Sequence, residues 1–348
     1  MERKLASVQR VLDVLPIENA DAIELVRING WQCVTKKGEF RTGDHGVFFE
    51  IDAIPPDTET FRFLWTPRAH DAAADGPVER PPKFRIRTMR LRGALSQGLF
   101  LPLTAFPAGL DDGLSDGDDL TERLGVGKYE PPAPAGMGEW RAPFPPLVSK
   151  TDEMRVQSVP AVLGEMWGRP YAITLKYDGT SATYLIDPRD GAFHACGRNH
   201  SVLDGENLYW RLARKYDLET VLRRTPRYAL QGEIVGPGVQ KNPLGLTEIA
   251  LFVFNVFDME AARFLGHDEA REFLAGAGLP AVETLETGES FAHDQERLLA
   301  LAEGKYPGTS NEREGIVVRP REEAHSLALG GRLSFKAISN RYLLKEQD

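Results

Sequence analysis

Lys176 is the residue whose type and setting point most directly to chemistry. It follows an apolar run at residues 171–175 that predicts a strand, and it opens the sequence Lys176-Tyr177-Asp178-Gly179, which favours a tight turn. A lysine amine is a poor nucleophile while protonated, and desolvation, neighbouring cations or a metal ion favour its neutral form. The pattern predicts a nucleophilic lysine, although an exposed turn with Lys176 in water explains these four residues equally well.

Later segments carry the other residue types that phosphate and nucleotide chemistry needs. Arg198 can bind a phosphate with two hydrogen bonds, the ring of Phe254 can stack on a base, and Lys336 can offset developing negative charge. Carboxylates supply the hard oxygen ligands that Mg²⁺ takes. Asp178, Glu233 and Glu314 carry such groups.

Each of these residues also has an ordinary structural explanation. Arg198, Glu233, Glu314 and Lys336 suit exposed positions, and an aromatic residue such as Phe254 is more often part of a core. No one of these residues by itself indicates a function. The functional interpretation depends on the order in which they follow one another along the chain.

That order resembles the motif order of the covalent nucleotidyltransferases, and among them the RNA ligases. Lys176-Tyr177-Asp178-Gly179 resembles motif I, and the segment around Arg198 lies where these enzymes carry an arginine. The segments that resemble motifs III, IIIa, IV and V are Gln231-Gly232-Glu233-Ile234, Phe252-Val253-Phe254-Asn255, Glu314-Gly315-Ile316-Val317-Val318 and Ser334-Phe335-Lys336. Residues 150–153 and 236–241 also look like RNA ligase sequences, the latter like those of a phage nick-sealing RNA ligase.

The resemblance implies ATP as cofactor, with AMP covalently on Lys176, and Mg²⁺ or Mn²⁺ held by Asp178, Glu233 and Glu314. Lys176, Lys336 and Arg198 are the expected catalytic residues. The expected nucleotide-binding residues are Lys176, Leu175, Gly179, Arg198, Glu233, Phe254, Glu314 and Lys336.

One position departs from the family pattern. Motif V in relatives commonly reads Lys-x-Lys, and Ser334 stands at the first of these positions. Only Lys336 is therefore carried over. Arg332, two residues before Ser334, is the candidate for supplying the missing charge.

The chain is long enough for two domains. Short runs at residues 22–28, 31–35, 46–51, 84–91 and 98–103 predict the strands of a small barrel. Residues 147–348 predict a mixed pattern that includes strands at 251–257, 315–319 and 333–337 and helices at 206–224, 268–277 and 295–303. The expected fold class is α+β: an oligonucleotide-binding (OB) barrel at residues 1–110, a Gly-, Asp- and Pro-rich linker at 111–146, and a nucleotidyltransferase (adenylation) domain with antiparallel sheets at 147–348. The domain order resembles that of the Deinococcus-type RNA ligases.

Composition limits the class of protein further. The formal net charge is −9, so any nucleic-acid contact must be a local basic patch, and Lys83, Arg85, Arg87, Arg90 and Arg92 are the candidates. Two distant cysteines, no secretory signal and no membrane-length apolar run predict a reduced, cytoplasmic protein. The oligomeric state stays open, with a monomer as the default expectation.

The sequence thus predicts an ATP-dependent RNA ligase that joins 3′-hydroxyl and 5′-phosphate ends, with a nicked duplex bearing an RNA 3′-hydroxyl as partner and template-directed RNA repair as role. Only twelve residues follow Lys336, whereas DNA ligases and capping guanylyltransferases place a barrel after motif V, so both are disfavoured. A DNA ligase and a non-catalytic nucleic-acid-binding protein with a ligase-like shell stay open as alternatives.

Overall fold

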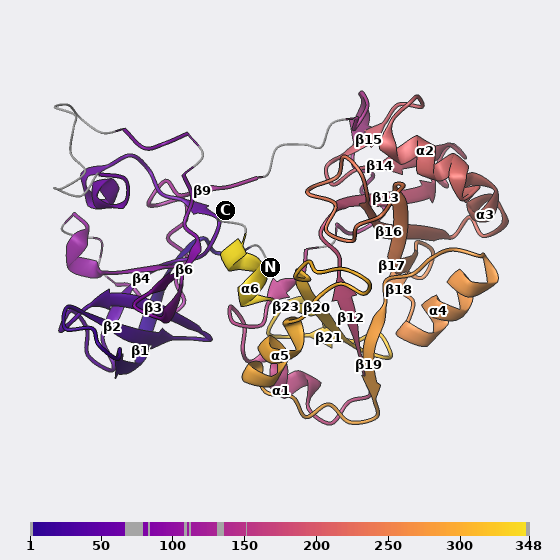
Figure 1. Ribbon diagram of the computed structural model, residues 1–348. Coiled ribbons are helices and arrows are strands. Elements are labelled where there is room, and N and C mark those ends of the chain that lie inside the picture. The colour runs from indigo at the N-terminus through magenta and orange to yellow at the C-terminus, as the bar shows by residue number, and fades with distance from the viewer. Residues whose placement is uncertain are drawn as a thin grey trace. The chain divides into compact units, whose positions relative to one another are not determined.

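The computed structural model describes residues 3–66, 79–82, 84–107, 110, 113–130, 136–150 and 152–345. The chain divides into two compact units, Met1–Pro131 and Pro132–Glu346 (Figure 1). Across the described residues, no helix combines the length and apolar character needed to cross a membrane.

An antiparallel sheet of five strands forms the centre of the first unit, in the order β3-β2-β1-β4-β8. Its strands are β1 (Ala6–Pro16), β2 (Ile23–Ile28), β3 (Trp31–Lys36), β4 (His45–Phe49) and β8 (Leu99–Pro102). The long strand β1 pairs with β4 through Ala6–Arg10 and with β2 from Val11 onward. This central strand was absent from the sequence prediction.

Shorter elements complete the first unit. They are β5 (Ala53–Ile54), β6 (Thr88–Leu91), β7 (Ala94–Gln97), β9 (Gly127–Lys128) and the 3₁₀ helices η1 (Glu59–Leu64) and η2 (Leu103–Ala105). Arg92 and Gly93, both with positive φ, form the two-residue turn of the β6–β7 hairpin. Leu120 and Val126, from the segment predicted as a linker, are buried with Val47 and Phe49 in the core of this unit.

The predicted strand at residues 84–91 is too long, because β6 begins only at Thr88. Arg85 therefore does not alternate along a solvent-facing strand. Its guanidinium lies 3.9 Å from the ring centre of Tyr129 and 3.4 Å from a carboxylate oxygen of Asp52. Arg90 and Arg92 are exposed and Arg87 is half-buried, whereas Lys83 lies outside the described residues.

Two sheets build the second unit. The seven-stranded sheet has the order β10-β15-β14-β13-β16-β17-β18 and the five-stranded sheet the order β11-β23-β20-β12-β19. Within these sheets the strands pair antiparallel, except that β11 and β23 are parallel. The first sheet contains β10 (Trp140–Pro143), β13 (Thr180–Ile186), β14 (Phe193–Cys196), β15 (His200–Val202), β16 (Tyr228–Val235), β17 (Ala250–Asp258) and β18 (Arg263–Phe264). The second contains β11 (Met154–Arg155), β12 (Tyr171–Lys176), β19 (Thr284–Gly288), β20 (Gly315–Pro320) and β23 (Phe335–Ile338). A separate pair is formed by β21 (His325–Ser326) and β22 (Gly331–Arg332).

Helices accompany these sheets in the second unit. They are α1 (Val162–Met166), α2 (Leu208–Lys215), α3 (Leu218–Arg224), α4 (His267–Gly276), α5 (Gln295–Ala302) and α6 (Asn340–Lys345) (Figure 1). Helices α2 and α3 pack on the seven-stranded sheet through Leu212 and Leu222. Helices α1 and α5 pack on the five-stranded sheet through Val162 and Leu298.

The prediction of one helix at residues 206–224 is wrong. The chain breaks at Asp217, which adopts a left-handed conformation with φ 49°. Leu218 lies six positions after Leu212, and both side chains are buried. In a continuous helix, six steps of about 100° each would place these two side chains on different faces. The break lets both leucines reach the core.

The sheets are joined at the segment that the sequence marks as reactive. Strand β12 ends at Lys176 in the five-stranded sheet, and β13 begins at Thr180 in the seven-stranded sheet. Residues 177–179 therefore carry the chain from one sheet to the other, so Lys176 lies where the two sheets part.

Candidate active site

Lys176 and Glu314 form an ion pair at this junction. Lys176 pairs in register with Gly315, so the residue before Gly315 lies next to the lysine on the neighbouring strand. The Lys176 Nζ donates to Glu314 Oε2 at 2.7 Å, and the two side chains are 25% and 16% exposed. The pair is thus partly shielded from water but open on one side.

The charges around Lys176 are mainly negative. Burial lowers the pKa of Lys176, but Glu314, Glu233 and Asp178 outweigh it and hold the pKa above its ordinary value. Burial raises the pKa of Glu233 to about 8, with Glu314 and Asp178 adding to the rise and Lys176 opposing it. The groups that act most strongly on Lys176 are therefore carboxylates, and not the cations that would favour a neutral amine.

Gly179 allows this turn to pass close to β16. A Cβ atom at Gly179 would lie 2.2 Å from the carbonyl oxygen of Ile234 and 2.9 Å from the Cγ of Glu233. No side chain fits in that space. The glycine therefore holds Asp178 and Glu233 in the same neighbourhood.

Tyr306 is a residue of the site that sequence reasoning missed. Its hydroxyl donates to the carbonyl oxygen of Lys176 at 2.8 Å and accepts from the backbone N–H groups of Asp178 and Glu314, both at 3.1 Å. The side chain is only 1% exposed. One hydroxyl thus fastens the backbone of the lysine turn to the backbone of Glu314. These three hydrogen bonds could not be predicted from the sequence, because every residue type offers the same main-chain atoms.

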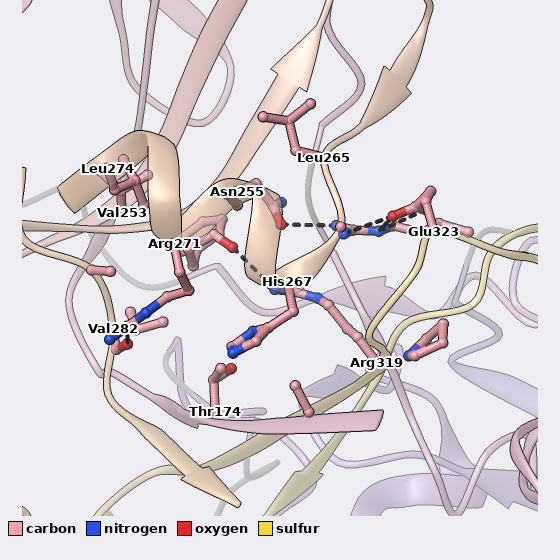
Figure 2. A pocket seen from close by; sticks show the side chains of 17 residues that line it. Thr174, Val253, Asn255, Leu265, His267, Arg271, Leu274, Val282, Arg319 and Glu323 are labelled. Atoms are coloured by element: carbon pink, nitrogen blue, oxygen red, sulfur yellow. Dashed lines mark hydrogen bonds and ion pairs between the residues drawn. The ribbon is translucent and has the colours of Figure 1, made fainter. Parts of the chain in front are cut away.

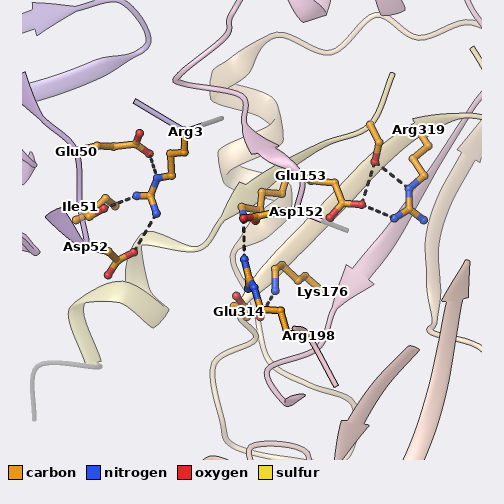
Figure 3. A network of polar contacts seen from close by, with 12 residues as sticks. Arg3, Glu50, Ile51, Asp52, Asp152, Glu153, Lys176, Arg198, Glu314 and Arg319 are labelled. Atoms are coloured by element: carbon orange, nitrogen blue, oxygen red, sulfur yellow. Dashed lines mark hydrogen bonds and ion pairs between the residues drawn. The ribbon is translucent and has the colours of Figure 1, made fainter. Parts of the chain in front are cut away.

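A second set of charges is joined by Asp152, from the segment at residues 150–153. Its carboxylate accepts from Arg198 Nη2 at 2.8 Å and from Lys336 Nζ at 3.4 Å (Figure 3). Arg198 also lowers the pKa of Glu233, which places it near the carboxylates around Lys176. Arg198 and Lys336 thus share Asp152 as a partner. Arg198 also lies near Glu233, one of the carboxyl groups around Lys176.

Phe254 and Leu175 have different settings. Phe254 lies half-buried on β17, on the side that faces the five-stranded sheet. The side chain of Leu175 is 2% exposed and belongs to the core, so only its backbone is available to a ligand. Its backbone N–H donates to the carbonyl oxygen of Glu283 at 2.9 Å.

An open pocket adjoins Phe254 between the two sheets (Figure 2). It is partly open to solvent, and its lining includes Thr174, Phe254, His267 and Arg319. Lys176 is not among the lining residues. Thr174 precedes Lys176 by two residues in β12, and alternation along a strand puts both on one face. The pocket therefore extends from the neighbourhood of Lys176 along the inner face of the sheet.

The three predicted metal ligands surround Lys176 and not a common point. In the part of the chain that the structure describes, only Asp187, Asp190 and His194 form a group of three or more possible ligands whose atoms all lie within 4.8 Å of one another. Asp187 is already paired with Arg189, whose Nη2 lies 2.6 Å from it. Around Lys176, the carboxyl groups of Asp178, Glu233 and Glu314 outnumber the one ammonium group, and oxygen ligands of this kind suit a divalent cation.

Arg332, the candidate for supplying the missing charge of motif V, has partners other than Ser334. Arg332 belongs to β22, donates to Asn255 Oδ1 at 2.8 Å and pairs with Glu323 at 3.0 Å. The cation that contacts Ser334 is Arg319, whose Nε donates to the Ser334 hydroxyl at 3.0 Å.

Comparison with known proteins places this geometry in a family. A family model described as an OB-fold domain matches residues 5–103, and one described as RNA ligase matches residues 169–338. A search of curated protein sequences found no match. The two matched models define the class: a protein with an OB-fold domain followed by an RNA ligase domain, which confirms the expected α+β fold.

Solved structures of the Naegleria gruberi RNA ligase are similar over the whole chain. The one with PPi has 36% identity and a TM-score of 0.86 and covers 100% of both chains. A lysine-to-alanine variant with ATP and Mn has 36% identity and a TM-score of 0.85, and a lysine-to-methionine variant with AMP and Mn has 35% and 0.85; each covers 99% of both chains. The chain belongs to the RNA ligase family.

Replacing Tyr306 by Phe tests the backbone clamp. The substitution keeps the ring and leaves a buried carbonyl oxygen and two buried N–H groups without their partner, which we expect to cost about 1–3 kcal/mol of unfolding free energy. Urea unfolding followed by circular dichroism measures the loss. Tyr216→Phe is the control, since no hydrogen bond of the Tyr216 hydroxyl is found among the described residues. Equal stability of the two variants would contradict the clamp.

Glu153 gives the site a pH-dependent contribution to stability. Burial raises the pKa of Glu153, but Arg319, Lys336 and Arg332 outweigh it and lower the pKa to about 2 from an ordinary 4.5. Because the folded pKa is depressed, the contribution is complete above about pH 4.5 and is lost as the pH falls toward 2. Its size is roughly 3 kcal/mol.

We therefore expect Glu153→Gln to destabilise the protein at pH 7 and to differ less and less from the parent as the pH falls below 4.5. Urea midpoints at pH 7, 5, 4 and 3 measure this difference. Glu248→Gln, which removes a 78% exposed partner of Lys215, is the control. A constant difference across the range would argue against the shift at Glu153.

Proposed function

We propose that this chain is an ATP-dependent RNA ligase that works through a covalent Lys176–AMP intermediate. The observation that carries the proposal is the Lys176 ammonium held at 2.7 Å by Glu314, with Glu233 and Asp178 around it, where the two sheets part. A relative with 36% identity has been solved with ATP and Mn, and also with PPi. Phe254 lines a pocket near this group.

The first step joins the lysine to AMP. The neutral Lys176 amine attacks the α-phosphorus of ATP, the phosphorus–nitrogen bond forms, and the bond to the leaving pyrophosphate breaks. The amine must first lose a proton, which Glu314 is placed to accept. Arg198 and Lys336 offer positive charge for phosphate oxygens.

The carboxylates around Lys176 fit Mg²⁺ or Mn²⁺, since hard oxygen ligands suit both ions. When bound, such an ion offsets the negative charge that now favours the protonated lysine, and it polarises the phosphate. Asp178, Glu233 and Glu314 are the residues that would hold it.

The remaining steps transfer AMP and seal the strand. An oxygen of the 5′-phosphate attacks the phosphorus of Lys176–AMP and frees the lysine. The 3′-hydroxyl then attacks the activated 5′-phosphate, the phosphodiester bond forms, and AMP leaves. Throughout, Phe254 would hold the adenine by stacking.

Lys176→Ala tests the covalent step. We expect no labelling of the variant by ATP radioactive in its α-phosphate, because no other amine is held at this position. Labelled protein on a denaturing gel measures the adduct. Lys215→Ala, which changes a lysine on α2, is the matched control and should label as the parent does. A label that persists in Lys176→Ala would refute the assignment.

The natural substrate is a separate proposal. We propose template-directed sealing of nicks whose 3′-hydroxyl end is RNA, with the first unit binding the duplex through Arg87, Arg90 and Arg92. Support comes from the exposure of Arg90 and Arg92 and from the OB-fold match. OB folds bind oligonucleotides in many proteins. The Deinococcus-type assignment, the cytoplasmic location and the monomeric state stay predictions.

Nicked duplexes that differ only in the sugar at the 3′-hydroxyl end test this substrate. We expect faster sealing with ribose than with deoxyribose, and replacement of Arg87, Arg90 and Arg92 by Gln should slow sealing while Lys176 labelling is kept. Product formation on a sequencing gel measures the rates. Faster sealing with deoxyribose would favour a DNA ligase, and labelling without sealing of any nick would point to another end structure.

A further inference from the structure

Phe254 is the extra residue of a β-bulge. Gln231 of β16 pairs with Asn255 of β17, and the next residue, Gly232, pairs with Val253. Phe254 therefore has no partner on β16. A bulge bends its strand and shifts the alternation of side chains, so that Phe254 and Asn255 both project toward the five-stranded sheet.

A bulge interrupts the ladder of backbone hydrogen bonds between two strands. The backbone of Phe254, and with it the position of its ring, therefore depends on another hydrogen-bond partner. Arg319 supplies one from β20 of the opposite sheet, since its Nη1 donates to the carbonyl oxygen of Phe254 at 3.1 Å. The neighbouring bulge residue, Asn255, is held by Arg332 at 2.8 Å. Two arginines from the segment between motifs IV and V thus fasten the bulge.

Arg319 is itself held by two other segments. Its Nε donates to the Ser334 hydroxyl at 3.0 Å and its Nη2 to Glu153 Oε1 at 2.9 Å (Figure 3). The side chains of Arg319 and Glu153 are 13% and 15% exposed. A planar guanidinium can serve three acceptors in fixed directions, which an ammonium group cannot.

This arrangement also accounts for Ser334. A lysine at position 334 would bring a second cation against the Arg319 guanidinium, whereas serine offers an acceptor. The hydrogen bond from Arg319 to Ser334 therefore explains why serine, and not lysine, suits position 334.

We propose that Arg319 is a positioning residue for ATP, which fixes the bulged Phe254 so that its ring meets the adenine. The inference rests on the proposed function. Arg319 acts through Phe254, so its effect should fall on the binding of ATP and not on the transfer step.

A double-mutant cycle tests the coupling. Arg319→Gln should raise the KM for ATP in Lys176 labelling about tenfold, with kcat changed less than about threefold. In a Phe254→Ala background, the same substitution should raise the KM less than about twofold, because the ring it positions is gone. Arg321→Gln, which removes an arginine just after β20 that pairs with Asp268 and Glu289, is the matched control and should leave both constants unchanged.

The outcomes separate cleanly. The proposal would be overturned if Arg319→Gln raised the KM for ATP by the same factor with and without Phe254→Ala, or if Arg319→Gln left the KM unchanged. Labelling of Lys176 in the parent protein would stand in either case. If ATP does not label the parent protein at all, the proposed function is wrong, and this inference fails with it. Should Arg319→Gln melt below the assay temperature, Arg319→Lys takes its place in the cycle, with a smaller expected rise in KM for the single variant.

Discussion

The ion pair between Lys176 and Glu314 is the contact on which the second unit depends. It joins the end of β12 to the start of β20, and the Glu314 carboxylate favours the protonated form of the Lys176 amine. The same carboxylates that stabilise the ammonium are the ligands that a divalent cation takes. The carboxylates around Lys176 therefore hold the pKa of its amine above the ordinary value.

The fold keeps this contact at the place where the two sheets part. Because residues 177–179 leave one sheet and enter the other, a small shift in either sheet would move Lys176 relative to Glu233. Gly179 fixes the turn against β16, and Tyr306 fixes it against Glu314. Chemistry that needs alignment within about an ångström is supported here by backbone contacts and not only by the reactive side chains.

Residue type and order predicted much of the site but not its connections. Lys176, Glu233 and Glu314 were identified because their chemistry is specific to their types, and the structure places them together. Tyr306 was missed because its hydroxyl binds backbone atoms far away in the sequence, which leave no pattern. The same limit applied to the fold: β1 was missed, and the helix at residues 206–224 was extended through Asp217, because tertiary burial of Leu218 set the break.

Ser334 shows why a motif must be interpreted together with its spatial neighbours. By sequence alone, a serine in place of lysine removes a positive charge, and Arg332 was the nearest substitute along the chain. In space, Arg319 lies against Ser334, while Arg332 is drawn to Glu323 and Asn255. Burial and the nearby Arg319 lower the pKa of Arg332 to about 10, and Glu323 opposes them. Two half-buried arginines already lie near Ser334, so a further cation at position 334 would cost more than the serine does.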